Sequence, residues 1–151
     1  MRMKRFSILL AFLFLFLSHS AFAQQDVCNQ TNNLLNVAIN STTAATTRLV
    51  DNTGATQRYI VVCNYTVVLV GNTVANTLIF KQGTGASCGT GSSNITGPIS
   101  AGSAATSNIV LPASALPFGK LQVGNSLCMT TTTTDLIGGN LTYVFVGPGI
   151  P

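Results

Sequence analysis

Charged side chains are scarce in this sequence. Asp, Glu, Lys and Arg make up only 7% of its 151 residues, and tryptophan and glutamate are absent. Three of the cations, Arg2, Lys4 and Arg5, lie at the extreme N-terminus. After residue 23 the net charge is +1, from Arg48, Arg58, Lys81 and Lys120 against Asp26, Asp51 and Asp135. Nucleic-acid binding requires clustered Lys and Arg, so we expect no nucleic-acid partner.

The groups that most enzymes use for proton transfer are also missing. The single histidine, His19, lies within the first 23 residues, so the remaining chain can build neither a Ser-His-Asp triad nor a histidine zinc centre. A glycosidase needs two neighbouring carboxylates, whereas the three aspartates lie in predicted turns or in the N-terminal tail. No phosphate-binding G-x-x-x-x-G-K-[ST] motif occurs. We therefore expect no catalytic residues, no cofactor and no metal site, and the sequence does not indicate an enzyme.

Long hydrophobic runs are absent as well. The most apolar segment, residues 8–17, has ten residues, and a membrane-spanning helix needs about 20. Basic residues precede this segment and Ala21-Phe22-Ala23 follows it, which is the pattern of a signal peptide. We expect residues 1–23 to be a signal peptide cleaved after Ala23. The protein would then be secreted or periplasmic, without membrane contact after cleavage.

Four cysteines are present: Cys28, Cys63, Cys88 and Cys128. Their wide spacing does not fit the C-x₂-C pairs of zinc sites. An even number of cysteines in an exported chain indicates two disulfides.

The chain after residue 23 is rich in threonine and in β-branched runs, which favour strands. In 59–70 the odd positions are apolar throughout, which predicts a strand with one fully buried face. We expect 77–81 to be its hairpin partner, and 121–134 with 140–146 to form a second hairpin. The predicted fold is an all-β, antiparallel, jelly-roll-like β-sandwich with disulfide staples, in which 24–57 is an N-terminal arm with short strands and 24–151 a single domain.

Two polar patterns are candidates for binding or modification. Alternation along 130–134 would place Thr130, Thr132 and Thr134 on one strand face, where hydroxyls could order water or bind carbohydrate. An exposed strand that uses threonine for its β-propensity explains the same pattern. The N-x-[ST] triplets at Asn29, Asn40, Asn64, Asn94 and Asn140 are either glycosylation acceptors or chance products of an Asn- and Thr-rich chain.

Five segments occur in a fixed order: RYIVVCNY (58–65), FKQGTGASCGTG (80–91), NITGPI (94–99), VGNSLCM (123–129) and IGGNLTYVFV (137–146). This order resembles a family of small jelly-roll-like β proteins found in tailed-phage, environmental viral and bacterial genomes, whose function is unsettled. The resemblance covers residues 58–146 and implies a virion accessory or decoration role. The signal peptide of this chain departs from that pattern.

The predicted strands favour one disulfide pairing. Cys63 lies in the predicted central strand and Cys128 in a strand of the second predicted hairpin, so we expect them to pair within one sheet core, leaving Cys28 for Cys88. Pairing of Cys63 with Cys88 and of Cys28 with Cys128 is the alternative. Together these features predict a non-enzymatic exported module with a structural or surface-interaction role, alternatively a virion component or a carbohydrate-binding or adhesive domain. Low charge also favours self-association, hence a homo-oligomer.

Overall fold

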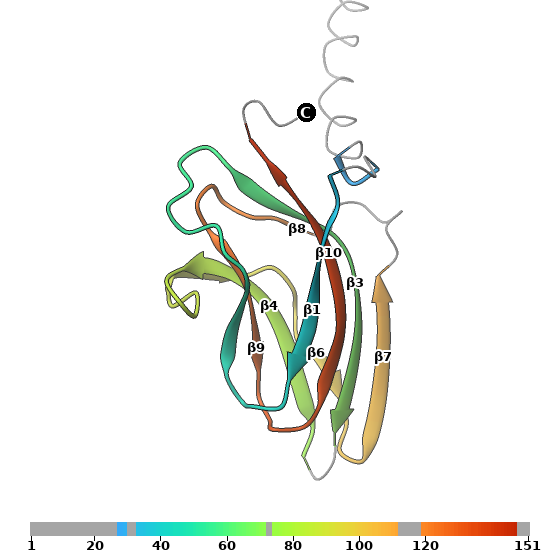
Figure 1. Ribbon diagram of the computed structural model, residues 1–151. Helices are drawn as coiled ribbons and strands as arrows, with labels where there is room; N and C mark the ends of the chain where they lie inside the picture. Colours follow the sequence, from blue (N-terminus) through green and yellow to red (C-terminus); the bar gives the residue numbers. More distant parts are fainter. Residues whose placement is uncertain (1–26, 30–32, 72–73, 112–118, 148–151) are drawn as a thin grey trace, which may run out of the picture.

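The computed structural model describes residues 27–29, 33–71, 74–111 and 119–147. These residues form ten strands in two antiparallel sheets that pack face to face (Figure 1). The predicted all-β antiparallel sandwich is therefore confirmed. The signal peptide predicted for residues 1–23, with its cleavage site after Ala23, lies outside the described residues.

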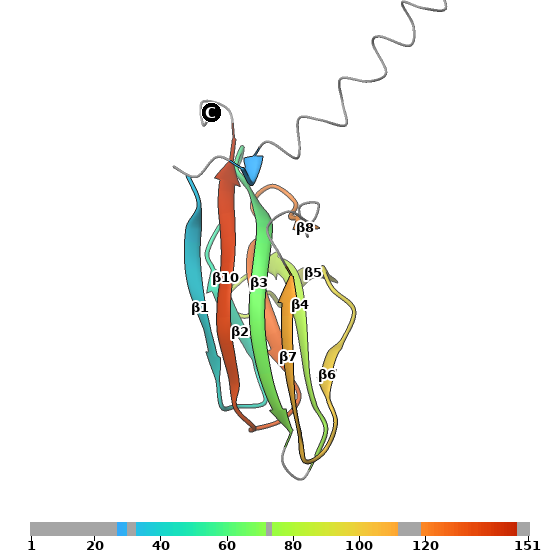
Figure 2. The same cartoon turned by 90° about the vertical axis from the view of Figure 1, so that its right-hand side faces the viewer.

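Each sheet contains five strands. Sheet A has the order β1 (Leu35–Ser41), β10 (Ile137–Val146), β3 (Tyr59–Gly71) and β7 (Ala105–Leu111), and β8 (Gly119–Lys120) also pairs with β3. Sheet B has the order β2 (Thr46–Val50), β9 (Ser126–Thr131), β4 (Asn76–Thr84) and β5 (Thr90–Asn94), and β6 (Ile99–Ala101) also pairs with β4. Figure 2 views sheet A from its outer side, with β1, β10, β3 and β7 side by side.

The hydrophobic core lies between the two sheets. Sheet B contributes Leu78 and Phe80 from β4, and sheet A contributes alternate residues of β3 and β10. Leu141 is fully buried, and Tyr143 and Phe145 pack against the core. The tyrosine ring of Tyr65 contacts Phe80 across the sandwich, with 5.2 Å between ring centroids.

A β-bulge in β3 reverses the expected alternation. Asn64 pairs with Thr142, and Val62 pairs with the next residue, Tyr143, so Cys63 is left over between them. Beyond the bulge the odd positions face the core, as predicted for 65–69. Before it the even positions face the core, and Val61 and Cys63 belong to a separate cluster on the outer face. The prediction of a single face for all odd positions was therefore wrong over 59–63.

Neither predicted hairpin forms. β3 lies in sheet A and β4 in sheet B, and β9 and β10 are divided in the same way. The partners of β3 are β10 and β7, and those of β4 are β9, β5 and β6. Alternation shows which side of a strand is buried but not which strand lies beside it, so sequential neighbours were wrongly paired.

The segment 24–57 contributes one edge strand to each sheet. β1 pairs with β10 over seven residue pairs, and β2 pairs with β9, so the short strands expected in this arm are present. Within the described residues, no helix has the length and apolarity that a membrane span requires.

Candidate functional site

The first disulfide, Cys28–Cys63, lies on the outer face of sheet A. The bulge directs Cys63 away from the core, where it meets Cys28 with 5.5 Å between Cα atoms. Val61 and Val144 are buried around this bridge, and Leu34 and Val146 pack beside them. The bridge therefore holds the N-terminal segment over the upper part of sheet A.

The second disulfide, Cys88–Cys128, lies on the outer face of sheet B. On β9, Leu127 and Met129 point into the core, so Cys128 between them points outward. There it bonds to Cys88, which lies in the Gly/Ser-rich loop of residues 85–89 between β4 and β5. Both predicted pairings are wrong, because the sandwich core separates Cys63 from Cys128. Their placement in one sheet had assumed the hairpins that do not form. Two disulfides are typical of an oxidising environment outside the cytoplasm.

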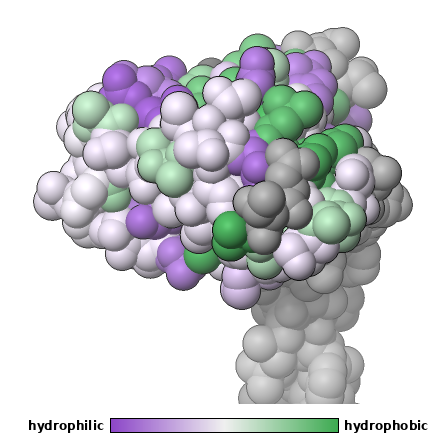
Figure 3. Space-filling model, turned by 90° about the horizontal axis from the view of Figure 1, so that it is seen from below, coloured by the Kyte–Doolittle hydropathy of each residue, from purple (hydrophilic) through white to green (hydrophobic). Residues whose placement is uncertain are grey.

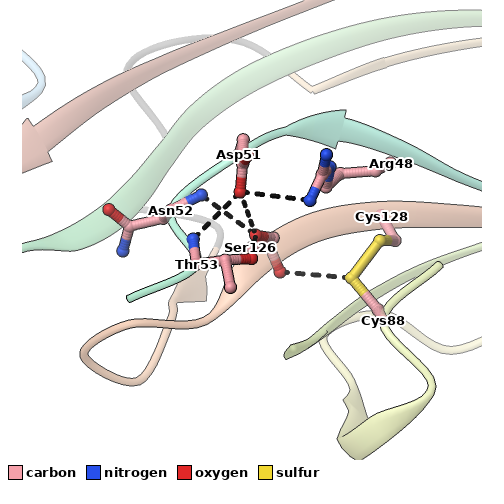
Figure 4. Close-up of polar contacts among 7 residues, drawn as sticks. All are labelled: Arg48, Asp51, Asn52, Thr53, Cys88, Ser126 and Cys128. Atoms are coloured by element: carbon pink, nitrogen blue, oxygen red, sulfur yellow. Dashed lines mark hydrogen bonds and ion pairs between the residues drawn. A yellow bond between two sulfur atoms is a disulfide. The ribbon is translucent and has the colours of Figure 1, made fainter. Parts of the chain in front are cut away.

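A polar cluster joins the end of β2 to the start of β9 (Figure 4). The hydroxyl of Ser126 accepts from the backbone N–H of Asn52 at 2.9 Å and donates to Asp51 Oδ1 at 3.2 Å. Asp51 also accepts from the N–H of Thr53 and forms an ion pair with Arg48, with 3.2 Å between Nη1 and Oδ1. The hydrogen bond from the Thr53 backbone is the main cause of a lowered Asp51 pKa.

This cluster has a structural role. Ser126 is fully buried, so its hydroxyl is inaccessible to a substrate, and Asn52 is 1% exposed. Asn52 also accepts from Arg58 Nε at 2.8 Å and donates to the Arg58 carbonyl at 3.0 Å. The cluster therefore fixes the 51–58 turn against β9 rather than presenting a nucleophile.

Hydroxyl groups gather on the outer face of sheet B, and we call them the hydroxyl patch. Its members come from four strands and the turn after β9: Thr46, Thr77, Ser100, Thr130 and Thr132. The hydroxyls of Thr46 and Thr130 lie 2.8 Å apart, and those of Thr77 and Ser100 lie 3.2 Å apart. Thr132 Oγ1 accepts from the Thr77 backbone N–H at 3.1 Å. The patch runs across the strands rather than along one of them.

The structure divides the three threonines predicted to bind a surface. Strand β9 ends at Thr131, so only Thr130 lies on a strand, and the residues 132–135 form a bend. Thr130 and Thr132 both join the hydroxyl patch, whereas Thr134 lies in the exposed turn toward β10. The predicted row of three hydroxyls along one strand is therefore not formed.

A second uncharged surface covers the lower part of sheet A on its outer side. We call it the Asn–Thr face, and it consists of Asn36, Asn40, Asn64, Thr66, Asn140 and Thr142 with Ala38 between them. Strand register aligns these residues in rows: Asn36, Thr142 and Asn64 form one, and Ala38, Asn140 and Thr66 the next. The Thr142 hydroxyl donates to Asn36 Oδ1 at 2.7 Å, which links two strands of the first row.

Sequence analysis found only part of this face. Asn40, Asn64 and Asn140 belong to N-x-[ST] triplets, and in a strand the first and third residues of a triplet share a face. That rule could have identified the pairs Asn64/Thr66 and Asn140/Thr142. Asn36 carried no such signal, because its place beside Thr142 depends on the pairing of β1 with β10.

None of the four cations in the described part of the chain belongs to the rows of the Asn–Thr face, and three of them contact other side chains. Arg58 lies over the Phe145 ring, 4.0 Å from its centroid, and Lys120 lies 4.2 Å from the centroid of Tyr59. Arg48 pairs with Asp51. Among the described residues, no three His, Cys, Asp or Glu side chains are grouped so that they could hold a metal ion.

The lower end of the sandwich carries the turn after β3 and the turn between β9 and β10. Figure 3 shows this end covered mostly by residues of intermediate hydropathy. Two exposed apolar side chains, Val74 and Leu136, belong to the turns after β3 and β9. Chemically, these surfaces offer hydroxyls, carboxamides and small apolar groups, which suit hydrogen bonding and close packing rather than attraction of a charged ligand.

Comparison with known proteins assigns no family. No family model matches the chain, and no curated protein matches it. A solved structure with some similarity is described as the crystal structure of the T13 IBDV viral particle. The two chains share 10% sequence identity with a TM-score of 0.34, and the match covers 77% of this chain and 31% of that one.

Proposed function

We propose that this protein is a non-enzymatic, exported β-sandwich that serves as a structural or surface-interaction module. The observation that carries the proposal is the Asn–Thr face. Three adjacent strands present carboxamides and hydroxyls in register there, and no charged residue interrupts the rows. A neutral sheet face with polar groups in register suits contact with another extended, neutral polar surface.

The disulfides support an exposed role outside the cytoplasm. Each bridge attaches a segment to the outside of one sheet, so neither is needed to close the core. Such bridges stabilise a small domain where reducing agents are absent and proteases are present. Export through the predicted signal peptide agrees with this arrangement.

The proposal predicts binding that depends on the face and not on charge. The mature chain, 24–151, would be tested for co-sedimentation with isolated bacterial cell envelopes, purified phage particles and neutral polysaccharides. Binding through the Asn–Thr face should change little between low and high salt, because charge attraction is screened by salt and contact between neutral groups is not. Thr66→Lys should weaken it by placing a charge within the face.

A matched control carries the same change elsewhere. Ser92 is exposed in β5 of sheet B, away from the Asn–Thr face, so Ser92→Lys should leave binding intact. Equal loss in both variants, or binding that disappears in salt, would contradict the proposal. Turnover of any substrate tested would contradict its non-enzymatic part.

The two alternative functions predict binding to different samples. Recovery of the mature chain in purified phage particles would favour a virion accessory or decoration protein, which is the role implied by the five motif segments. Binding on a glycan array would favour a carbohydrate-binding or adhesive domain. Two of the three tyrosines are not available for stacking on a sugar, because Tyr65 is buried in the core and Tyr143 packs against it.

A further inference from the structure

Strand β1 forms one lateral edge of sheet A. One side of it pairs with β10 over seven consecutive residue pairs, and no other strand of the described residues pairs with it. In Figure 2 it is the outermost strand of the sheet. An edge strand presents backbone N–H and C=O groups that can pair with another chain.

The usual protections of an edge strand are missing from β1. Its sequence, LNVAINS, contains neither a charged residue nor a proline, and its register with β10 has no bulge. The corresponding edge of sheet B is different, because β2 contains Arg48 and a register shift between Arg48 and Val50. Of these two edge strands, β2 is therefore protected against pairing and β1 is not.

The sequence of β1 is also close to a palindrome. Reading outward from Ala38, the neighbours are Val37 and Ile39 and then Asn36 and Asn40. The two asparagines and Ala38 are exposed on the outer side, while Ile39 is buried and Val37 half-buried toward the core. When two identical strands pair antiparallel about Ala38, a residue that follows Ala38 lies opposite the residue at the same distance before Ala38 in the other copy. In a near-palindromic strand these two residues have similar side chains.

We propose that β1 pairs with β1 of a second copy of this chain, antiparallel, about a two-fold axis at Ala38. Ala38 then faces Ala38, each Val37 faces Ile39, and each Asn36 faces Asn40. The β-branched pair contributes packing on the core side, and the asparagines pair carboxamides on the outer side. The same patch serves both copies, as a two-fold interface requires.

Such a dimer would have one continuous sheet of ten strands, five from each copy. A two-fold axis perpendicular to the sheet keeps the outer faces of both copies on the same side, so the two Asn–Thr faces would join into one surface. The interaction uses the edge of β1, including Asn36 and Asn40, whereas the proposed function also uses residues such as Thr66 that lie away from this edge. The two can therefore be tested separately.

The test is a charge exchange at position 38. The mature, disulfide-bonded chain should sediment as a dimer. In Ala38→Lys and in Ala38→Glu, two like charges oppose each other at the axis, and the dimer dissociation constant should rise by about tenfold or more. An equimolar mixture of the two variants should form a heterodimer, because opposite charges then face each other.

Thr66→Lys is the control, since it adds the same charge two strands away in the same row and should leave the dimer intact. Hydrogen exchange on the unaltered protein provides a second measurement, with β1 amides exchanging faster on dilution. A monomeric unaltered protein would overturn the proposal. So would an assembly that Ala38→Lys does not weaken, or variants that fail to recombine.

Discussion

At the scale of single residues, a small number of polar side chains each make several hydrogen bonds that hold the fold. The Ser126 hydroxyl accepts a hydrogen bond from the backbone N–H of Asn52 and donates one to Asp51. The Asn52 side chain accepts from Arg58 Nε and donates to the Arg58 carbonyl. In a chain with so few charges, these buried hydrogen bonds fix the 51–58 turn together with the Arg48–Asp51 ion pair. Removing one partner leaves another polar group buried without compensation.

Replacement of Ser126 tests this dependence. Ser126→Ala leaves the buried N–H of Asn52 without its acceptor, and the free energy of unfolding should fall by about 1–3 kcal/mol. Urea denaturation followed by circular dichroism measures the change. Ser92→Ala, at an exposed position of β5, should change stability by less than about 0.5 kcal/mol, and an equal effect of the two changes would contradict the role of Ser126.

Asp51 makes stability depend on pH in the acid range. The hydrogen bonds from Thr53, first its backbone N–H, lower the Asp51 pKa in the folded state below the usual 3.8. A carboxylate with a lowered pKa adds stability above its unfolded pKa and loses it as pH falls through the folded value. The melting temperature should therefore fall as the pH drops below 3.8, and protonation of Asp51 should cause part of that fall.

The comparison of two aspartate variants isolates that contribution. Asp51→Asn should flatten the acid decline of the melting temperature, because the carboxylate that responds to pH is gone. Asp135→Asn removes a carboxylate from the turn before β10 and should retain the Asp51 part of the decline. Identical pH profiles for the unaltered protein and Asp51→Asn would refute this assignment.

At the scale of strands, pairing depends on local backbone features that hydrophobic alternation does not reveal. The bulge at Cys63 reverses the buried face of β3 and directs this cysteine outward. Gly139 of β10 lies between β1 and β3, opposite Ile39 and Val67. Its φ of +153° and the close approach of the Thr66 carbonyl leave no room for a side chain.

Two neighbouring glycines provide a direct test of that close approach. Gly139→Ala would overlap the Thr66 carbonyl oxygen and should destabilise the protein by about 2 kcal/mol or more, through displacement of β3 from β10. At Gly138 an added Cβ meets no atom within 4 Å, so Gly138→Ala should be tolerated. Thermal unfolding of the two variants compares them directly, and equal melting temperatures would show that β10 can shift without cost.

At the scale of the whole molecule, two disulfides fasten one segment to the outside of each sheet. The Cys88–Cys128 bridge spans 40 residues and holds the Gly/Ser-rich loop against β9. The Cys28–Cys63 bridge spans 35 residues and holds the N-terminal segment against β3 and β10. Both sheets therefore have one covered part and one open polar part on their outer faces.

Loss of a bridge should reduce stability while preserving the sandwich core. For Cys88→Ala with Cys128→Ala, the chain-entropy model gives a loss of roughly 4 kcal/mol for a loop of 40 residues. Denaturant unfolding measures the loss, and peptide mapping without reduction should recover Cys28 joined to Cys63 in the double variant. A Cys63–Cys128 peptide from the unaltered protein would contradict the sheet assignment itself.

The local composition of the chain was sufficient to predict its class. β-branched alternation, turn residues and four widely spaced cysteines indicated a disulfide-stapled antiparallel sandwich, and the apolar odd positions correctly identified the core side of β3 over 65–69. These features depend on near neighbours in the chain, because a strand with one buried face must repeat every two residues.

Only the tertiary structure decided which strands are neighbours, and the disulfides and surfaces follow from that choice. Leu141 lies beside Tyr65, which is far away in the sequence, and the chain crosses from sheet B to sheet A between β9 and β10. Strand pairing depends on the packing of the whole core, and several pairings bury the same alternating faces equally well. The sequence alone therefore could not identify the cysteine pairs, the hydroxyl patch or the Asn–Thr face, because all three depend on which strands are neighbours.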